Sequence, residues 1–267
     1  MFGFTKRKIR VELDQGVRVI AIGDIHGQID RLRAVMEDVD HYRQKNPVQE
    51  EHIVFLGDFT DRGPASADVI EYLLARKKNA KQSDHTEIFL KGNHEQLLLD
   101  ALSGKTEKSD LWWRNGGRET VHHYADYCGF DLSGDIIAHH LEKLRENFPD
   151  SHLKFFDRLE TQYRVGPLVF VHAGIRMDKP LKDQQEEDLI WIRGTFLNWK
   201  GPPKKYLIVH GHTITSNFRP EIKKHRIGLD TGSYRLKGQI TAGLFEGNKV
   251  RFISNGTKKN FKSSPFD

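Results

Sequence analysis

Short apolar runs alternate with amphipathic stretches along the first hundred residues of the chain. The apolar runs at 17–22, 53–56 and 87–90 are each short enough to form a buried strand. Each is followed by a polar loop and then by apolar residues at helical spacing. This order predicts three β-α units and a largely parallel, buried sheet.

The pattern changes between residues 103 and 165. We find no clear strand there, but the apolar spacing predicts helices around 136–148 and 152–159. We interpret this stretch as a mostly helical insertion beside the sheet. Trp112 and Trp113 lie within it, and we interpret both as packing residues, with substrate contact as the alternative.

The predicted sheet then resumes with strands at 168–171 and 206–209. Closely spaced candidates follow at 226–229, 239–245 and 249–253. The last two are separated by Glu246-Gly247-Asn248, which is typical of a hairpin turn. We expect these late strands to be antiparallel and to form a second sheet packed on the first. No internal repeat or linker divides the chain, so we predict one α/β domain over 1–267, with a core at about 17–253 and basic tails at both ends.

Composition places the chain among globular proteins. Of its 267 residues, 37% are hydrophobic and 30% are charged. No apolar run approaches the roughly 20 residues that span a bilayer, and the first residues lack the apolar core of a secretory signal. The one cysteine, Cys128, cannot form an intrachain disulfide. Together these features predict a cytoplasmic protein without a membrane partner.

The net charge is +5, with basic residues gathered near 6–10 and 258–262. A basic balance can indicate a nucleic-acid partner. These clusters are short and lack interleaved aromatic residues, so we interpret them as solvated tails and disfavour nucleic acid as a partner.

Polar residues with metal-binding chemistry come directly after the predicted strands. They are Asp24, His26, Asp58, Asn93, His94, His172, His210 and His212. Each alone is an ordinary turn or core residue, but parallel strands bring their carboxyl ends to one edge of a sheet. Carboxylate, imidazole and amide ligands without a thiolate suit two divalent cations such as Mn, Fe or Zn. Such a site is suited to phosphoryl transfer to water.

Three motifs carry a resemblance to a known family: GDIHG at 23–27, GDFTDRG at 57–63 and GNHE at 92–95. They resemble the signature motifs of the phosphoprotein phosphatases in the calcineurin-like metallophosphoesterase superfamily. With HAG at 172–174 and GHT at 211–213, the resemblance covers residues 17 to about 253. The segment LDTG at 229–232 is similar to the bacterial branch, which includes serine/threonine phosphatases and symmetrical diadenosine tetraphosphatases.

The resemblance implies a β-sandwich of mixed sheets flanked by helices, with two metal ions, manganese first and iron or zinc as alternatives. It implies that the first metal is held by Asp24 and His26, that Asp58 bridges both, and that the second is held by Asn93, His172 and His212. His210 is the rival of His212, which we prefer because it matches the Gly-His-Thr pattern. The superfamily often has a further His where this chain has Ile214, so the first metal would have fewer protein ligands.

The same resemblance implies the catalytic roles. Arg62 and Arg193 would bind the phosphate, although a surface ion pair is the alternative for Arg193. His94 would be the general acid, held by Asp61. We expect Glu95 to cap the helix that it opens.

Together these features predict a phosphomonoesterase that hydrolyses phosphoserine or phosphothreonine, with phosphotyrosine left open, by attack of a metal-bridging hydroxide. Its partner would then be a phosphoprotein or phosphopeptide. The alternative is a symmetrical diadenosine tetraphosphatase. Asp61 beside His94 favours the first, because a phosphate leaving group needs less protonation than an alkoxide. A nuclease, an inactive binding module and a thiol-dependent phosphatase are disfavoured, and the oligomeric state stays open.

Overall fold

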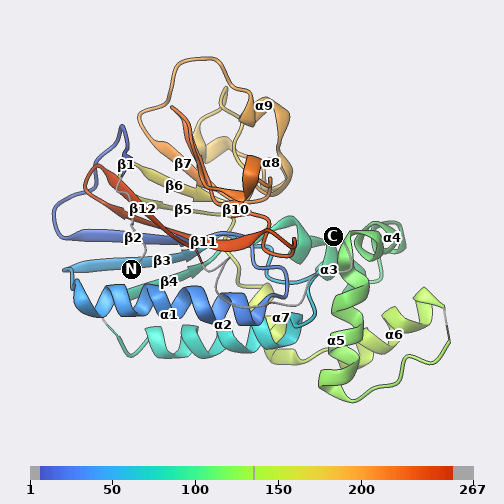
Figure 1. Cartoon of the computed structure of the whole chain (residues 1–267). Helices are drawn as coiled ribbons and strands as arrows, with labels where there is room; N and C mark the ends of the chain where they lie inside the picture. The colour runs from blue at the N-terminus through green and yellow to red at the C-terminus, as the bar shows by residue number, and fades with distance from the viewer. Residues whose placement is uncertain (1–6, 84, 135, 255–267) are drawn as a thin grey trace.

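The computed structural model describes residues 7–83, 85–134 and 136–254. Two β-sheets lie face to face, with helices on their outer sides (Figure 1). The first sheet has the order β1-β12-β11-β2-β3-β4, with β10 paired to β11, and the second has the order β5-β6-β7-β9-β8. The first consists of β1 (Arg7–Lys8), β2 (Val17–Ile22), β3 (Glu50–Phe55), β4 (His85–Phe89), β10 (Asp230–Thr231), β11 (Gln239–Glu246) and β12 (Lys249–Ser254). The second consists of β5 (Gln162–Val165), β6 (Leu168–Val171), β7 (Leu207–His210), β8 (Glu221–Ile222) and β9 (Arg226–Gly228).

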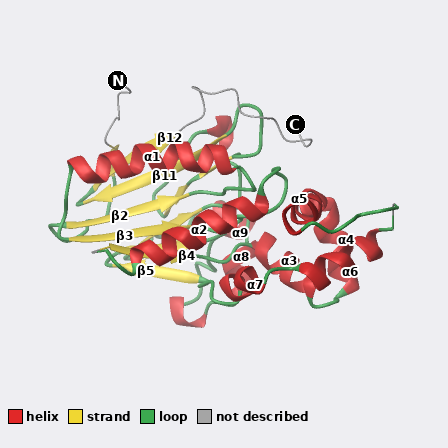
Figure 2. Ribbon diagram, turned by 90° about the horizontal axis from the view of Figure 1, so that it is seen from below, coloured by secondary structure: helices red, strands yellow, loops and turns green. Residues whose placement is uncertain are grey.

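Helices cover both outer faces and form a separate group at one side. They are α1 (Ile29–Lys45), α2 (Ser66–Ala80), α3 (Asn93–Leu102), α4 (Thr106–Trp112), α5 (Arg118–Cys128), α6 (Ile137–Asn147), α7 (Asp150–Phe156), α8 (Glu186–Trp191) and α9 (Gly194–Leu197). A π-helical turn (Trp113–Gly117) joins α4 to α5, and short 3₁₀ turns occur at Leu181–Asp183 and Ser216–Phe218. In Figures 1 and 2, α1 and α2 lie along the first sheet, and α4, α5 and α6 stand together to the right of the sheets.

Three apolar layers hold the sandwich together. Ile53 faces α1 and α2, and Phe245 lies in the layer between the two sheets. Phe196 packs in a third layer on the outer face of the second sheet. Burying one such side chain contributes about 1.5–3 kcal/mol. The observed architecture confirms the predicted α/β sandwich of mixed sheets and helices.

The strand directions bring the candidate residues to one edge. Strands β2, β3 and β4 pair in parallel, so the loops after them emerge at the same end of the first sheet. Strands β6 and β7 are also parallel, so His172 and His212 emerge together from the second sheet.

The prediction for the late strands was partly wrong. Strands β11 and β12 are antiparallel, as expected, but they belong to the first sheet, where β11 pairs with β2. Strand β11 has buried apolar residues on both faces, with Leu244 toward the helices and Phe245 toward the second sheet. It therefore needs a place inside the sheet that is covered on both sides. Of the three predicted late strands, only that at 226–229 joins the second sheet, as β9, where it pairs with β8 and runs parallel to β7. The strands at 168–171 and 206–209, expected to continue the first sheet, also lie in the second sheet, as β6 and β7.

The stretch 103–165 is mostly helical, as predicted, but it ends in β5. This strand gave no signal because its residues are only partly buried at the edge of the second sheet. Of the basic tails, Arg7 and Lys8 pair with β12, whereas the cluster at 258–262 lies outside the described residues. Within the described ranges, no helix is both long enough and apolar enough to cross a membrane.

Candidate metal centre

The candidate ligands lie in the loops that follow β2, β3, β6 and β7 and, for Asn93, at the start of α3 after β4. Several of these loops hold their residues in a strained backbone conformation. The described part of the chain has seven non-glycine residues with positive φ, and five of them are His26, Asp58, Asp61, Arg62 and His212. Such strain costs about 1–3 kcal/mol per residue and is typical of functional sites.

Asp58 lies at the middle of the cluster and belongs to two groups of candidate ligands. Its Oδ2 lies 3.5 Å from Nε2 of His26 and 4.0 Å from Nε2 of His94. Its Oδ1 lies 3.2 Å from Nε2 of His172. The two oxygens of one carboxylate therefore face two different sets of side chains.

The second group, with Asn93 beside it, brings together an amide oxygen and two imidazole nitrogens that can bind a metal when both histidines are neutral. Oδ1 of Asn93 lies 3.0 Å from Nε2 of His172 and 2.8 Å from Nδ1 of His212. The two imidazole nitrogens are 3.2 Å apart. All three side chains are buried, so water cannot relieve their crowding. A divalent cation would satisfy all of them at once.

Backbone groups fix the orientation of the ligands. Nδ1 of His26 donates to the carbonyl of Thr60 (3.0 Å), and Nδ1 of His172 donates to that of Leu56 (2.8 Å), so both Nε2 atoms face the cluster. This arrangement is common among histidines that bind metals. Asp24 accepts the backbone N–H of His212 at 3.0 Å.

Gly211 makes the approach of Asp24 possible. A Cβ at this position would lie 2.0 Å from Oδ1 of Asp24. Any larger residue would therefore push the carboxylate out of the cluster.

The buried charges shift one another's pKa values. Burial opposes ionisation of Asp58, but the imidazoles of His172, His94 and His26 outweigh it and hold its pKa well below the usual range. Burial likewise opposes protonation of His172, yet Asp58 and Asp24 raise its pKa to about 9. Burial and the neighbouring carboxylate of Asp230 raise the pKa of Asp24 well above its ordinary value.

The site residues fit a pair of divalent cations. Nδ1 of His212 faces Asn93 and His172 in the cluster, and its buried Nε2 has no hydrogen-bond partner among the described residues. The pKa of His212 is lowered to about 2, first by burial and then by His172, so the imidazole is neutral and keeps a lone pair. Oxygen and nitrogen donors without sulfur suit Mn, Fe or Zn. The predicted ligands Asp24, His26, Asp58, Asn93, His172 and His212 are thus brought into one cluster.

The structure separates His210 from His212. Nδ1 of His210 contacts the carbonyl of Gly211, and its Nε2 lies 3.4 Å from Nη1 of Arg226. Burial and Arg226 lower the pKa of His210 to about 3. Its ring packs against Phe196 on the far side of the second sheet, away from Asp58.

Asp61 and His94 form a buried pair beside the cluster. Nδ1 of His94 donates to Oδ2 of Asp61 at 2.7 Å. Two residues missed by sequence reasoning also bind this carboxylate. Nε1 of Trp112 donates to Oδ2 at 2.8 Å, and Oγ1 of Thr120 donates to Oδ1 at 2.6 Å. Trp112 is fully buried, so it contributes a hydrogen bond in addition to the packing that we expected.

Two arginines lie at the cluster. Nη1 of Arg62 lies 3.1 Å from Nε2 of His26, and its guanidinium lies 4.6 Å from the ring centre of Tyr234. Arg193 is exposed, contacts Oγ1 of Thr213 at 3.4 Å, and helps to lower the pKa of His212. Both cations could reach an anion bound at the cluster, and Arg193 has no carboxylate partner among the described residues.

Glu95 does more than begin α3. Its carboxylate accepts the backbone N–H groups of Asp58, Phe59 and Gly92 at 2.8–2.9 Å. Burial and the charge of Asp58 raise its pKa to about 7. Glu95 therefore ties the loop after β3 to the start of α3. An acid in the first turn of a predicted helix was the sequence signal, but its long-range partners were not visible.

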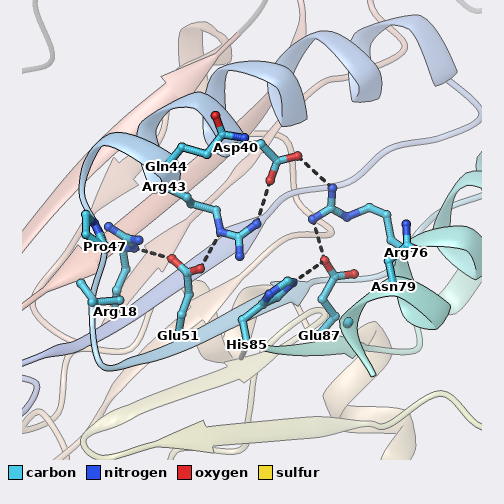
Figure 3. Close-up of a pocket in the computed structure, with 12 residues that line it drawn as sticks. Arg18, Asp40, Arg43, Gln44, Pro47, Glu51, Arg76, Asn79, His85 and Glu87 are labelled. Atoms are coloured by element: carbon cyan, nitrogen blue, oxygen red, sulfur yellow. Dashed lines mark hydrogen bonds and ion pairs between the residues drawn. The ribbon is translucent and has the colours of Figure 1, made fainter. Parts of the chain in front are cut away.

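A cavity of about 380 Å³ lies at the opposite end of the first sheet, near the starts of β2, β3 and β4. Figure 3 shows that its charged side chains are joined to one another. Glu51 binds Arg18 and Arg43, and Asp40 links Arg43 to Arg76. This chain of ion pairs holds the ends of α1 and α2 to the sheet and lacks the convergent lone pairs of the cluster.

Comparison with known proteins gives a family match over most of the chain. Residues 17–256 match the calcineurin-like phosphoesterase family. The chain is also similar in fold to a solved structure named as a candidate diadenosine tetraphosphatase, with a TM-score of 0.60 and 19% identity over 94% of this chain and 99% of that one.

Two curated relatives bear on the substrate. A Bacillus subtilis protein named asymmetrical bis(5'-nucleosyl)-tetraphosphatase PrpE is 34% identical over 229 residues, which cover 79% of this chain and 84% of the relative. Serine/threonine-protein phosphatase 1 of Salmonella typhimurium is 32% identical over 120 residues, which cover 43% of this chain and 48% of the relative.

Proposed function

This chain belongs to the calcineurin-like phosphoesterase family, and from that premise we propose that it hydrolyses dinucleoside polyphosphates with two divalent metal ions. Membership of this family makes the chain a metallophosphoesterase hydrolase. The observation that carries the proposal is the buried set of donors around Asp58, with candidate ligands on both sides of one carboxylate.

The choice of substrate departs from our first expectation of a protein phosphatase, which is not confirmed. The alternative, a dinucleoside polyphosphate hydrolase, is better supported, because the relative that aligns over most of both chains has that name. That name specifies asymmetrical cleavage, whereas our alternative was symmetrical. We therefore expect a tetraphosphate to yield a nucleoside monophosphate and a nucleoside triphosphate.

We assign separate metal-binding and phosphate-binding roles to the residues of the cluster. Asp24, His26 and Asp58 would hold one metal, and Asp58, Asn93, His172 and His212 the other. Bound metals would supply Lewis-acid stabilisation of phosphoryl oxygens and an activated water. Arg62 and Arg193 would neutralise further phosphate oxygens. Their guanidinium groups would also orient the polyphosphate for cleavage.

The test is to incubate the manganese-loaded protein with diadenosine tetraphosphate and to separate the nucleotides by anion exchange. AMP and ATP in equal amounts are expected. Two ADP molecules would reverse the asymmetrical assignment, and an intact dinucleotide would refute the proposed substrate. The same assay with magnesium, iron or zinc would rank the metals, among which we expect manganese to be most effective.

Phosphoprotein hydrolysis is a second candidate function, favoured by one observation. His94 is fixed by Asp61 in a fully buried pair next to the cluster. An oriented acid typically contributes roughly 10²–10⁴-fold when the leaving group needs a proton. Release of phosphate from a phosphopeptide panel, measured with the same enzyme preparation, tests this second function.

We also propose that the protein acts in the cytoplasm.

A further inference from the structure

We infer that Trp112 and Thr120, from the helical insertion, are positioning residues that set which leaving groups this site can expel. They do so by fixing the carboxylate of Asp61, which in turn holds His94. The inference rests on the second candidate function, the hydrolysis at the cluster of phosphoesters whose leaving group needs a proton. It assigns to the insertion a part in the chemistry, although Trp112 and Thr120 both lie outside the family's signature motifs.

Besides His94, the donors to the carboxylate of Asp61 come from the insertion, while Ser66 accepts its backbone N–H at 3.2 Å. Trp112 donates to the same oxygen as His94, and Thr120 donates to the other oxygen. Oγ1 of Thr120 also accepts the backbone N–H of Asp61 at 3.0 Å and contacts Oγ of Ser66 at 2.9 Å. Because Asp61 is wholly buried, these donors replace water in fixing and stabilising the carboxylate.

The π-helical turn explains how one short segment reaches this carboxylate. Trp112 ends α4, and Thr120 lies in the first turn of α5, just after the π-helical turn. Gly117 in this turn lets the indole pack closely, since a Cβ there would lie 2.5 Å from the Trp112 ring. The turn thus sets two donors, eight positions apart in sequence, against opposite oxygens of one carboxylate.

The chemical consequence depends on the leaving group. Water supplies the oxygen of the new P–O bond, and the bond to the leaving group breaks with its electron pair staying on the leaving oxygen. That oxygen takes a proton from Nε2 of His94. The proton that the attacking water loses then reprotonates His94. An alkoxide needs this proton, whereas p-nitrophenolate or a nucleotide phosphate leaves without it. Misplacing Asp61 should therefore strongly slow the hydrolysis only of esters with an alkoxide leaving group.

The experiment compares three substrates with each variant of the manganese-loaded enzyme: a phosphoserine peptide, p-nitrophenyl phosphate and diadenosine tetraphosphate. For Trp112→Phe and Thr120→Val we expect kcat/KM on the peptide to fall by about ten-fold or more, and on the other two by less than about three-fold. Thr120→Ser keeps the hydroxyl and should restore the peptide activity. Trp113→Phe is the matched control, because this neighbouring indole packs near His140 rather than Asp61.

A structural role alone would lower all three activities together and would overturn the inference, as would unchanged peptide activity in both variants. If Trp112→Phe does not fold, Thr120→Val with its serine partner gives the same comparison. Wild-type enzyme that releases phosphate from both monoesters but leaves the dinucleotide intact would refute the proposed substrate without touching this inference. Wild-type enzyme inactive on the peptide would overturn the inference alone.

Discussion

At the scale of single residues, Asp58 is the position on which the site depends. Its two oxygens face different groups of ligands, and Glu95 holds its backbone N–H. A neutral amide at this position would keep the shape but remove the charge that both cations need.

We expect Asp58→Asn to abolish binding of both metals and to lower kcat by more than about a hundred-fold. Metal content by atomic emission and turnover of p-nitrophenyl phosphate measure these effects. Asp178→Asn, at an exposed carboxylate, is the control and should change neither. Normal metal content in the Asp58 variant would show that other residues form the bridge.

His172 provides a prediction about protons. Its pKa of about 9 in the metal-free protein means that its imidazole is charged at pH 7, whereas a metal ligand must be neutral. Metal binding should therefore expel a proton at pH 7 and release fewer as the pH rises through 9, so that affinity increases with pH over this range. Calorimetric titration with Mn²⁺ in buffers of different ionisation enthalpy measures the release. Equal proton release at pH 7 and pH 9 would argue against this charge on His172.

At the scale of elements, the π-helical turn supports Arg62 as well as Asp61. The backbone N–H of Arg62 donates to the carbonyl of Gly116 at 3.1 Å. Gly116 has φ +103°, and a Cβ there would lie 2.6 Å from both N and Cγ of Arg62. The turn therefore needs glycine for its conformation and for the close approach.

Gly116→Ala should displace Arg62 and lower kcat/KM by about ten-fold to a hundred-fold, since small misplacements of a binding group are costly. Steady-state kinetics on diadenosine tetraphosphate measures the effect. Gly104→Ala is a matched control, because Gly104 also has positive φ (+84°) but nothing lies within 4 Å of its Cβ position. Equal losses in the two variants would mean that backbone strain, not contact with Arg62, is responsible.

At the scale of the whole molecule, stability and chemistry lie at opposite ends of the first sheet. The metal cluster follows the carboxyl ends of β2 and β3, whereas the ion pairs of Figure 3 surround their amino ends. Arg18 is only 1% exposed there, and its guanidinium pairs with Glu51 at 2.6 Å and with Glu246 at 3.2 Å. Glu51 also pairs with Arg43, so its loss removes the shorter ion pair of Arg18 and one ion pair of Arg43, and breaking a buried ion pair is strongly destabilising.

We expect Glu51→Gln to lower the free energy of unfolding by about 3 kcal/mol, while the folded protein keeps its kcat. Urea unfolding followed by circular dichroism measures the first quantity, and turnover at 20 °C the second. Glu37→Gln, on the exposed face of α1, should leave both unchanged. A large loss of kcat in folded Glu51→Gln protein would contradict the separation of the two ends.

The sequence alone determined the features that depend on near neighbours along the chain. Periodicity predicted the succession of strand, polar loop and helix. It therefore identified β2, β3 and β4 and the candidate ligands that follow them. Parallel pairing then placed Asp24, Asp58 and Asn93 at one edge, because strands connected through helices run in the same direction.

Tertiary structure decided what depends on residues far apart. His210 and His212 are two positions apart, yet only the packing of the second sheet turns one toward Arg226 and the other toward Asn93. The packing of distant segments decides which sheet β11 joins. It also decides that Trp112 and Thr120, 51 and 59 residues away in sequence, donate hydrogen bonds to Asp61. Periodicity indicates which face of a segment is buried but not which partner buries it. For this reason, only the folded chain showed these long-range contacts.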